Sequence, residues 1–362
     1  MKFETLCLHA DGNKKDEWGT LTAPICQSAT FVHKGVGEPS KFSYSRLSNP
    51  TRSHLENTVA ALENGEAAFA FSTGMAAIST VMKLFSAPAH IIASDDLYGG
   101  SLRLFRNVNA NDGLSFDFVD TGDLDAVKSL IRRETRAIYC ETPSNPLMRV
   151  SDISALAKIA RERGLYLIVD NTFLTPYYQK PLDMGADIVI HSGTKYLGGH
   201  NDTLAGFAVV KTRELAEKIA YLYKTFGACL APFDCFLVER GIKTLPLRMD
   251  KITANAKAVA AWLKGRGDVK KVYYAGLGGM ISFEAQSKAM AERILKKVKV
   301  FQYAESLGGV ESLITYPMLQ THADVPEKER NARGITDAFL RVSTGIENVE
   351  DLIEDLKQAF TL

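Results

Sequence analysis

The sequence has no excess of charge of one sign, because 43 lysines and arginines are balanced by 42 aspartates and glutamates. The formal charge of +1 gives no electrostatic reason to expect a nucleic-acid or membrane partner. No run approaches the ~18 consecutive apolar residues of a membrane span, and the N-terminus lacks the apolar core of a signal peptide. We therefore expect a soluble, cytoplasmic protein.

Cysteine is also scarce, and its spacing excludes the usual cysteine-based frameworks. The five cysteines are an odd number and contain neither a C-x-x-C pair nor the spacing of metal ligands: Cys7, Cys26, Cys140, Cys229 and Cys235. This usage suits a reducing compartment better than a disulfide scaffold or a zinc site. We expect no bound metal.

The chain is long enough for two domains, with 362 residues of which 46% are hydrophobic. Residues 1–50 are rich in Gly, Ser, Pro and Thr and show little periodicity. They predict an N-terminal arm that is either disordered or reaches toward another molecule. The pattern Ser53-His-Leu-Glu56 predicts a capping box that opens a helix over Leu55–Leu62.

Between residues 51 and 235, short apolar runs alternate with helical patterns. This alternation predicts an α/β domain with a mostly parallel sheet covered on both faces. The expected strands are Ala67–Phe71, Ile91–Ala93, Phe116–Val119, Ala137–Cys140, Leu165–Val169, Ile188–Ile190 and Ala205–Val210. The expected helices include Met75–Phe85, Leu124–Arg132 and Ile153–Arg163, the last with Gly164 as its C-terminal cap.

The pattern changes after about residue 235. A long helical pattern covers Phe236–Leu263, short strands are expected at Val272–Tyr274 and Met280–Phe283, and the helix Val349–Phe360 closes the chain. We therefore predict an arm over 1–50, a large domain over 51–235 and a smaller α+β domain over 236–362.

Three strand ends carry residues suited to chemistry, since ligands of open α/β sheets bind where strands end. After Ala67–Phe71, the stretch S-T-G-M-A-A begins a helix at a glycine and exposes N–H groups that favour a phosphate. Asp170 ends another strand, where a carboxylate needs a cationic or strongly donating partner such as a protonated ring nitrogen. Considered alone, each feature is better explained as an ordinary strand–turn–helix junction or an ordinary strand end.

The third strand end is H-S-G-T-K, which ends in Lys195. An amine at the edge of a buried site can form a Schiff base, and the hydroxyls of Ser192 and Thr194 suit phosphate oxygens. Considered alone, Lys195 is better explained as a solvent-facing loop lysine. Together, however, a phosphate cradle, a carboxylate and a reactive amine match one ligand, pyridoxal 5′-phosphate (PLP).

Three further residues fit the same interpretation. Tyr98 could stack on a flat cofactor and act as an acid or base, and Asn145 could hydrogen-bond the phenolic oxygen of the cofactor. Arg341 could bind the carboxylate of an amino acid through its two-pronged guanidinium. The alternative for Tyr98 is a packed loop tyrosine. Considered alone, Arg341 is better explained as an ordinary surface ion pair.

In combination, these motifs closely resemble the trans-sulfuration, or Cys/Met-metabolism, family of PLP enzymes. The resemblance runs from about residue 5 to the C-terminus and is carried by Y-S-R-L-S-N-P-T, S-T-G-M-A-A, L-Y-G-G-S, E-T-P-S-N-P, V-D-N-T and S-G-T-K-Y-L-G-G-H-N-D, in the family's order. It implies PLP-dependent fold type I, the aspartate-aminotransferase type, with a seven-stranded sheet in the large domain.

The resemblance also implies roles for single residues. Lys195 is similar to the Schiff-base lysine that also moves protons at the α-carbon of the substrate, and Asp170 to the partner of the pyridine nitrogen. The family's phosphate cradle is matched by Gly74, Met75, Ser192 and Thr194. Tyr98 matches the tyrosine that stacks on the cofactor ring, and Asn145 matches the partner of the phenolic oxygen. Ser306 and Arg341 match the residues that bind the substrate carboxylate.

Tyr44 and Arg46 match phosphate ligands that this family takes from the neighbouring subunit. The resemblance thus implies that the arm crosses a subunit interface in a homotetramer built from two dimers. An isolated monomer is then expected to lack activity.

Two positions bear on which reaction of the family applies. Gly100 stands where methionine γ-lyases have a cysteine, and Glu305 resembles a glutamate of γ-synthases and γ-lyases that could engage the amino group of cysteine. The run Ile314–Pro326 is most similar to bacterial cystathionine γ-synthases that use O-acylhomoserine. The resemblance therefore implies γ-replacement with cysteine to give cystathionine. Alternatives are a cystathionine γ- or β-lyase, an O-acetylhomoserine sulfhydrylase, or a catalytically silent PLP-binding protein.

The sequence departs from the family pattern in two places. G-H-N-D replaces the more frequent G-H-S-D after the lysine. The connection around Gly276–Gly279 is also shorter than in most family members, and loops of this kind tolerate a change in length.

Overall fold

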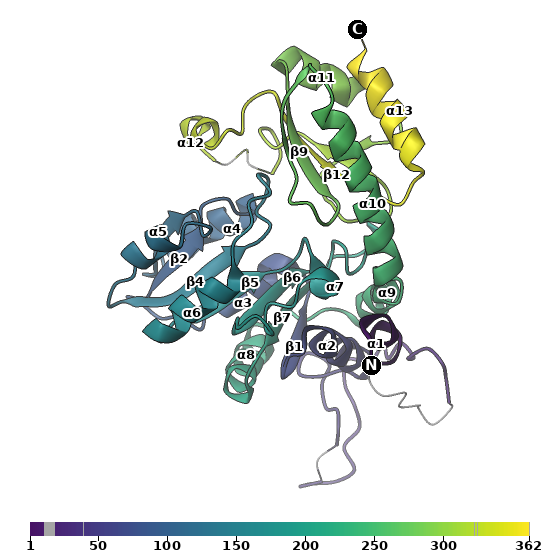
Figure 1. The fold of residues 1–362 in the computed structure, drawn as a ribbon. Helices are drawn as coiled ribbons and strands as arrows, with labels where there is room; N and C mark the ends of the chain where they lie inside the picture. The colour runs from purple at the N-terminus through teal and green to yellow at the C-terminus, as the bar shows by residue number, and fades with distance from the viewer. Residues whose placement is uncertain (11–18, 39, 322, 324, 362) are drawn as a thin grey trace. The chain divides into compact units, whose positions relative to one another are not determined.

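The computed structural model describes residues 1–10, 19–38, 40–321, 323 and 325–361. Its larger sheet has seven strands in the order β1-β7-β6-β5-β4-β2-β3 (Figure 1). The pairs β2/β3, β2/β4 and β5/β6 are parallel, whereas β7 runs antiparallel to both β1 and β6. The predicted α/β class with a mostly parallel sheet is confirmed. The strands are β1 (Ala67–Phe71), β2 (His90–Ser94), β3 (Ser115–Val119), β4 (Thr135–Glu141), β5 (Tyr166–Asp170), β6 (Ile188–Ser192) and β7 (Gly206–Val210).

The chain divides into two units, each built from two separate segments. The first unit contains Met1–Ser86 and Tyr166–Leu245, and the second contains Ala87–Leu165 and Pro246–Leu362. The boundaries at 50 and 235 that the sequence suggests stay a prediction. The helices up to residue 242 are α1 (Phe3–His9), α2 (Pro50–Glu63), α3 (Gly74–Met82), α4 (Gly99–Arg103), the π-helix η1 (Leu104–Asn109), α5 (Leu124–Ser129), α6 (Ile153–Arg163), α7 (Thr175–Tyr178), α8 (Arg213–Phe226) and α9 (Pro232–Ile242).

The expected capping box at Ser53 is wrong, because α2 begins four residues earlier than that motif predicts. Asn49 is the N-cap, and its side-chain oxygen accepts hydrogen bonds from the backbone N–H groups of Thr51 and Arg52. Pro50 occupies the first helical position, where its missing N–H costs nothing. Asparagine followed by proline was therefore the stronger start signal.

The long helix expected over Phe236–Leu263 is in fact two helices, α9 and α10 (Leu245–Lys264). Pro246 cannot donate to the carbonyl four residues earlier, so one continuous helix would lose a hydrogen bond there. At the break, the N–H of Thr244 instead donates to the carbonyl oxygen of Gly241 at 3.1 Å. The proline thus ends one helix and begins the next.

Other elements match the sequence patterns closely. Helix α6 spans the predicted Ile153–Arg163, Asp152 caps its N-terminus through the N–H of Ala155, and Gly164 ends it at φ 63°. The left-handed region suits glycine, as the sequence predicts. Strand β1 and the last helix, α13 (Val349–Phe360), also have their predicted bounds.

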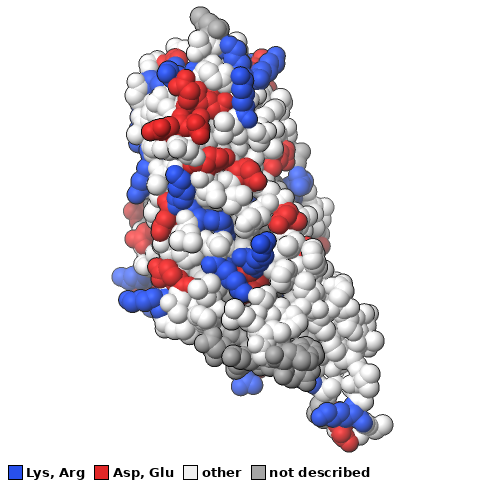
Figure 2. Space-filling model, turned by 90° about the vertical axis from the view of Figure 1, so that its right-hand side faces the viewer, with Lys and Arg blue, Asp and Glu red and all other residues white. Residues whose placement is uncertain are grey.

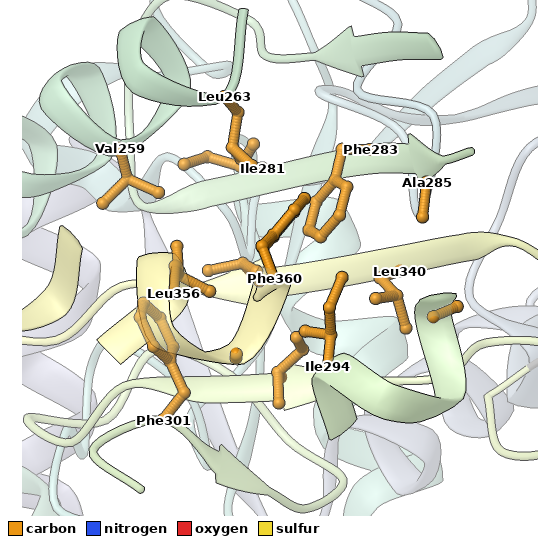
Figure 3. Packing of buried hydrophobic residues seen from close by; sticks show 14 of the residues in the cluster. Val259, Leu263, Ile281, Phe283, Ala285, Ile294, Phe301, Leu340, Leu356 and Phe360 are labelled. Atoms are coloured by element: carbon orange, nitrogen blue, oxygen red, sulfur yellow. The ribbon is translucent and has the colours of Figure 1, made fainter. Parts of the chain in front are cut away.

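The second unit contains a five-stranded sheet in the order β10-β11-β12-β9-β8. Apolar side chains from β9, β12 and the neighbouring helices form its core, including Phe283, Leu340 and Phe360 (Figure 3). The elements are β8 (Val269–Tyr273), β9 (Met280–Ala285), α11 (Lys288–Lys297), β10 (Gln302–Tyr303), β11 (Leu313–Thr315), α12 (Glu327–Ala332) and β12 (Phe339–Ser343).

The short connection around Gly276–Gly279 joins the antiparallel strands β8 and β9 directly. Gly276 and Gly278 have φ angles of 86° and 76°, which side chains rarely tolerate. The hydroxyl of Tyr274 donates to the carbonyl of Gly278 at 3.2 Å. The two antiparallel strands are therefore connected by a short turn, and no longer loop is needed.

Surface charge follows the balanced composition. On the face shown in Figure 2, basic and acidic side chains are interspersed rather than gathered into a patch of one sign. Within the described ranges, no helix combines the length and apolar character needed to cross a membrane.

Glu56 on α2 predicts a pH dependence of stability. Its side chain is 17% exposed, and burial raises its pKa to about 7, although the N–H of Ala70 (3.0 Å) and the nearby Arg52 act in the opposite direction. The folded state therefore binds this proton more tightly than the unfolded state, whose pKa is near 4.5. The protonated side chain therefore adds about 3 kcal/mol to the free energy of unfolding at pH values below about 4.5. This contribution is lost as the pH rises through about 7.

We expect Glu56→Gln to remove this contribution while keeping an acceptor for Ala70. Urea unfolding at pH 5 and pH 8 would show a smaller difference in unfolding free energy for the variant than for the native protein. Parallel pH profiles would contradict the prediction.

Candidate active site

Strand β6 leads directly into the turn that carries Lys195, a half-buried residue. The backbone N–H of Lys195 donates to the carbonyl of Ser192 at 3.2 Å, and its carbonyl accepts from the N–H of Gly199 at 2.7 Å. Gly199 has φ 74°, and a Cβ at Gly198 would lie 2.9 Å from the carbonyl oxygen of Gly193. The glycine pair therefore permits a tight turn that fixes the lysine at the end of the strand.

Asp170 ends β5 and is buried, with 8% of its surface exposed. Its Oδ1 accepts from both the backbone N–H (3.1 Å) and the hydroxyl (2.6 Å) of Thr172. That same hydroxyl oxygen accepts from the N–H of Ser192 at 2.9 Å. Thr172 thus links the Asp170 carboxylate to the end of β6, a role that its sequence position, two residues after the aspartate, could have suggested.

Helix α3 begins at Gly74 beside Ser192. A Cβ at Gly74 would lie 3.0 Å from Cβ and 3.3 Å from Oγ of Ser192, a tight contact that glycine avoids as the helix start approaches this hydroxyl. Thr73 caps the helix by accepting from the N–H of Ala76, and Met75 follows in the first turn. Exposed N–H groups beside a hydroxyl form an arrangement that favours an anion.

Thr194 is held differently from the other members of the predicted cradle. Its hydroxyl accepts from the N–H of Ala205 at 3.0 Å and lies 3.2 Å from the carbonyl oxygen of the same residue. The side chain therefore closes the turn against the start of β7. Its role as a phosphate ligand stays a prediction.

Tyr44 and Arg46 lie on the N-terminal arm, where Tyr44 is 46% exposed. The guanidinium of Arg46 lies over the Tyr44 ring and donates to the carbonyl of Lys224, at the end of α8. Apolar side chains of the arm are also almost fully exposed, at 93% for Val32 and 108% for Val36. Their contribution to a second chain stays a prediction.

In the second unit, Arg341 lies on β12 and is 2% exposed. Its guanidinium donates to Oδ1 of Asn145 (2.9 Å), the carbonyl of Ser306 (3.1 Å) and Oγ1 of Thr315 (3.3 Å). These three acceptors orient the guanidinium. The structure thus brings together three residues that the sequence singles out, Asn145, Ser306 and Arg341.

Ser306 has φ 133°, a conformation that is rare for a residue with a side chain. Strained backbone of this kind is concentrated at functional sites. The preceding Glu305 is exposed, so its carboxylate lies in solvent next to the residue that orients Arg341.

Tyr98 is the residue before α4 and is 41% exposed. Its backbone N–H donates to Oε2 of the buried Glu141 at 2.9 Å. Nearby, Asp96 accepts from the hydroxyl of Ser144 and from the N–H of Leu147 (3.0 Å), and burial raises its pKa to about 6. Asp96 therefore ties the Tyr98 loop to the loop that contains Asn145, a contact between residues too distant in sequence to be anticipated.

The family model for Cys/Met metabolism PLP-dependent enzymes matches residues 4–361. The chain belongs to this family. It is 51% identical over 360 residues to a cystathionine γ-synthase of Haemophilus influenzae, covering 99% of this chain and 97% of the relative. It is 52% identical over 349 residues to a cystathionine γ-synthase/O-acetylhomoserine (thiol)-lyase of Bacillus subtilis, covering 96% of this chain and 94% of that relative. The crystal structure of a cystathionine γ-lyase from Lactobacillus plantarum, complexed with L-serine, superposes with a TM-score of 0.97 at 44% identity and covers 99% of this chain and 98% of its own.

The family's cofactor is PLP, and the residues of the first unit suit it. Asp170 is a buried acceptor oriented by Thr172, Lys195 is an amine fixed at a strand end, and the start of α3 beside Ser192 suits a phosphate. A side chain at residue 74 would crowd Ser192, so glycine suits this close approach of the helix start to the Ser192 hydroxyl. The family's fold type and PLP dependence, predicted from the motifs, are confirmed.

Proposed function

We propose that this enzyme catalyses γ-replacement on an O-acylhomoserine with cysteine, giving cystathionine. The main support is the identity above 50%, over nearly the whole chain, to relatives whose names include cystathionine γ-synthase. Gly100 and the run Ile314–Pro326 point the same way, although His322 and Asp324 of that run lie outside the described residues. The structural match to a γ-lyase makes elimination from cystathionine the second candidate.

PLP, when bound, supplies an aldehyde that condenses with amines and a ring that stabilises negative charge at the α-carbon of an amino acid. Lys195 would bind the aldehyde at rest and then move protons at the α- and β-carbons of the substrate. Asp170 would keep a proton on the ring nitrogen. The phosphate would be bound by the cradle of Gly74, Met75, Ser192 and Thr194.

Arg341 and its neighbours would supply the substrate contacts. Arg341, oriented by its three acceptors, would bind the substrate carboxylate together with Ser306. Asn145 uses its amide oxygen for Arg341, which leaves its NH₂ group to donate to the phenolic oxygen of the cofactor. Tyr98 would stack on the ring and assist proton transfer. Glu305 would engage the amino group of cysteine.

Removal of a β-proton by Lys195 would let the electron pair of that C–H bond expel the acyloxy group from the γ-carbon as a free carboxylate. The cysteine thiolate would then add at the γ-carbon, and Lys195 would return a proton to the β-carbon. For the assembly, we propose a cytoplasmic homotetramer in which Tyr44 and Arg46 complete the phosphate site of a neighbouring chain. The exposed apolar side chains of the arm support this part of the proposal.

The deciding experiment supplies the purified protein with O-acetyl- or O-succinylhomoserine plus cysteine, and separately with cystathionine. We expect cystathionine in the first reaction and little keto acid in the second. Keto acid from cystathionine without any cystathionine synthesis would overturn the synthase assignment in favour of a lyase. Sulfide in place of cysteine tests for a sulfhydrylase.

A separate measurement tests the alternative that the chain is a catalytically silent PLP-binding protein. Borohydride reduction followed by peptide mass spectrometry is expected to place a pyridoxyl adduct on Lys195. An adduct without turnover of any of these substrates would indicate the silent protein, and absence of the adduct would refute the role of Lys195.

Arg341→Lys is expected to lower kcat/KM for the amino-acid substrates by about 100-fold, mainly through KM, because an ammonium cannot replace the two-pronged guanidinium. The absorption of the bound cofactor should be retained. Steady-state kinetics would check this, with the exposed Arg213→Lys as the matched control. An unchanged kcat/KM would remove Arg341 from the substrate site.

A further inference from the structure

A cluster of buried polar side chains lies behind the cofactor-binding end of β5 and β6. Glu63, at the end of α2, and His191, on β6, are both 0% exposed, and Oε1 of Glu63 lies 2.6 Å from Nε2 of His191. The same oxygen accepts from Nδ2 of Asn171 at 3.0 Å. Asn171 also exchanges hydrogen bonds with Gln179, at 2.8 and 3.0 Å. We call Glu63, Asn171, Gln179 and His191 the Glu63 cluster.

The cluster lies on the opposite face of the sheet from the proposed cofactor residues. Asp170 pairs with Ile190 in the parallel ladder, and side chains alternate between faces along a strand. Asp170 and Ser192 therefore share one face, where Thr172 joins them. Asn171 and His191 share the other face, where Glu63 joins them.

Buried polar side chains at this position cost stability compared with apolar side chains of the same size. Oε2 of Glu63 and Nδ1 of His191 are buried without a hydrogen-bond partner in the part of the chain that the structure describes. Unsatisfied buried polar atoms destabilise a fold, and apolar residues of similar shape would avoid this penalty. The cluster is therefore better explained by what it positions than by what it contributes to stability.

We propose that Glu63 is a positioning residue that joins the ends of β5 and β6 and so fixes Asp170 relative to the turn that carries Lys195. Glu63 contacts each strand one residue from a proposed cofactor ligand, next to Asp170 on β5 and next to Ser192 on β6. The two bridges, Thr172 on one face and Glu63 on the other, hold the strand ends together from both sides. This inference rests on the roles proposed above for Asp170 and Lys195.

Glu63→Gln tests the proposal, because it keeps the shape of the side chain and removes its charge. Glu66→Gln, an exposed position three residues further on, is the matched control. In the apoprotein, we expect amide hydrogen exchange at Asn171 and Ser192 to be faster in the Glu63 variant than in the control. In the PLP-loaded enzyme, we expect the pH midpoint of the cofactor absorption change to shift and kcat to fall about 10- to 100-fold with little change in KM.

The results separate a positioning role from a purely structural one. A lower unfolding temperature with unchanged exchange at these two amides and an unchanged absorption midpoint would overturn the proposal. If Glu63→Gln yields no folded protein, His191→Gln decides by the same readouts, because it removes the imidazole and leaves Glu63 bonded to Asn171. If the native protein itself shows no cofactor absorption, the proposed function fails. A normal native spectrum with variants indistinguishable from the control refutes the positioning role alone.

Discussion

Replacing Lys195 by alanine is expected to reduce kcat by at least about 10⁴-fold. The change removes the amine that is proposed both to bind the cofactor aldehyde and to move protons at the substrate α-carbon, and proton transfer alone contributes about 10²–10⁴-fold. The fold should persist, because the turn is held by the backbone bonds of Lys195 to Ser192 and Gly199. Steady-state assays and mass spectrometry after borohydride reduction measure the two losses together.

Lys211→Ala is the matched control for this experiment. Lys211 follows β7 in the same unit and is exposed, so its loss should leave both turnover and the pyridoxyl adduct unchanged. Retention of more than about one hundredth of the native kcat by Lys195→Ala would exclude this lysine as the principal proton carrier.

Gly206→Ala is expected to displace the start of α3, which carries part of the proposed phosphate cradle, although Gly206 itself is not one of the cradle residues. A Cβ at Gly206 would lie 2.1 Å from the carbonyl oxygen of Thr73 and 2.6 Å from the backbone nitrogen of Gly74. Both atoms belong to the backbone at the start of α3, so the helix start must move. Overpacking of this kind costs about 1–3 kcal/mol of unfolding free energy.

The displaced helix start should also weaken PLP binding, by about 5- to 150-fold if the whole of that cost falls on the PLP-bound state. Titration of PLP into the apoprotein, together with urea unfolding, would measure both effects. Gly267→Ala is the control, because a Cβ there meets nothing within 4 Å. Equal PLP affinity for the two variants would show that β7 does not support the cradle.

Much of the fold could be predicted from the sequence because its signals are local. Helix α6 has a capping aspartate, an apolar face and a terminal glycine within a dozen residues, and its bounds were predicted correctly. Errors arose where two local signals competed. The Ser53 pattern was weaker than Asn49-Pro50, and Pro246 interrupted a periodicity that otherwise continues.

The candidate site residues are marked by motifs, whereas the contacts that hold them could not be predicted from the sequence. Lys195, Asp170 and Arg341 are marked by their neighbours in sequence. Glu63 and His191 are separated by 128 positions, and the bond between them exists only because α2 packs near the end of β6. The place of β7 between β1 and β6 is likewise a property of the folded sheet.

The hydrogen bond between Arg341 and Asn145 would couple two proposed contacts, that of Arg341 with the substrate carboxylate and that of Asn145 with the cofactor. The amide oxygen of Asn145 is held by the guanidinium, so the orientation of this amide depends on the position of Arg341. A carboxylate that draws the guanidinium toward itself would also release the amide to rotate. If Asn145 contacts the phenolic oxygen of the cofactor as proposed, binding of the substrate would then change the hydrogen bond to that oxygen, and with it the electron demand of the ring.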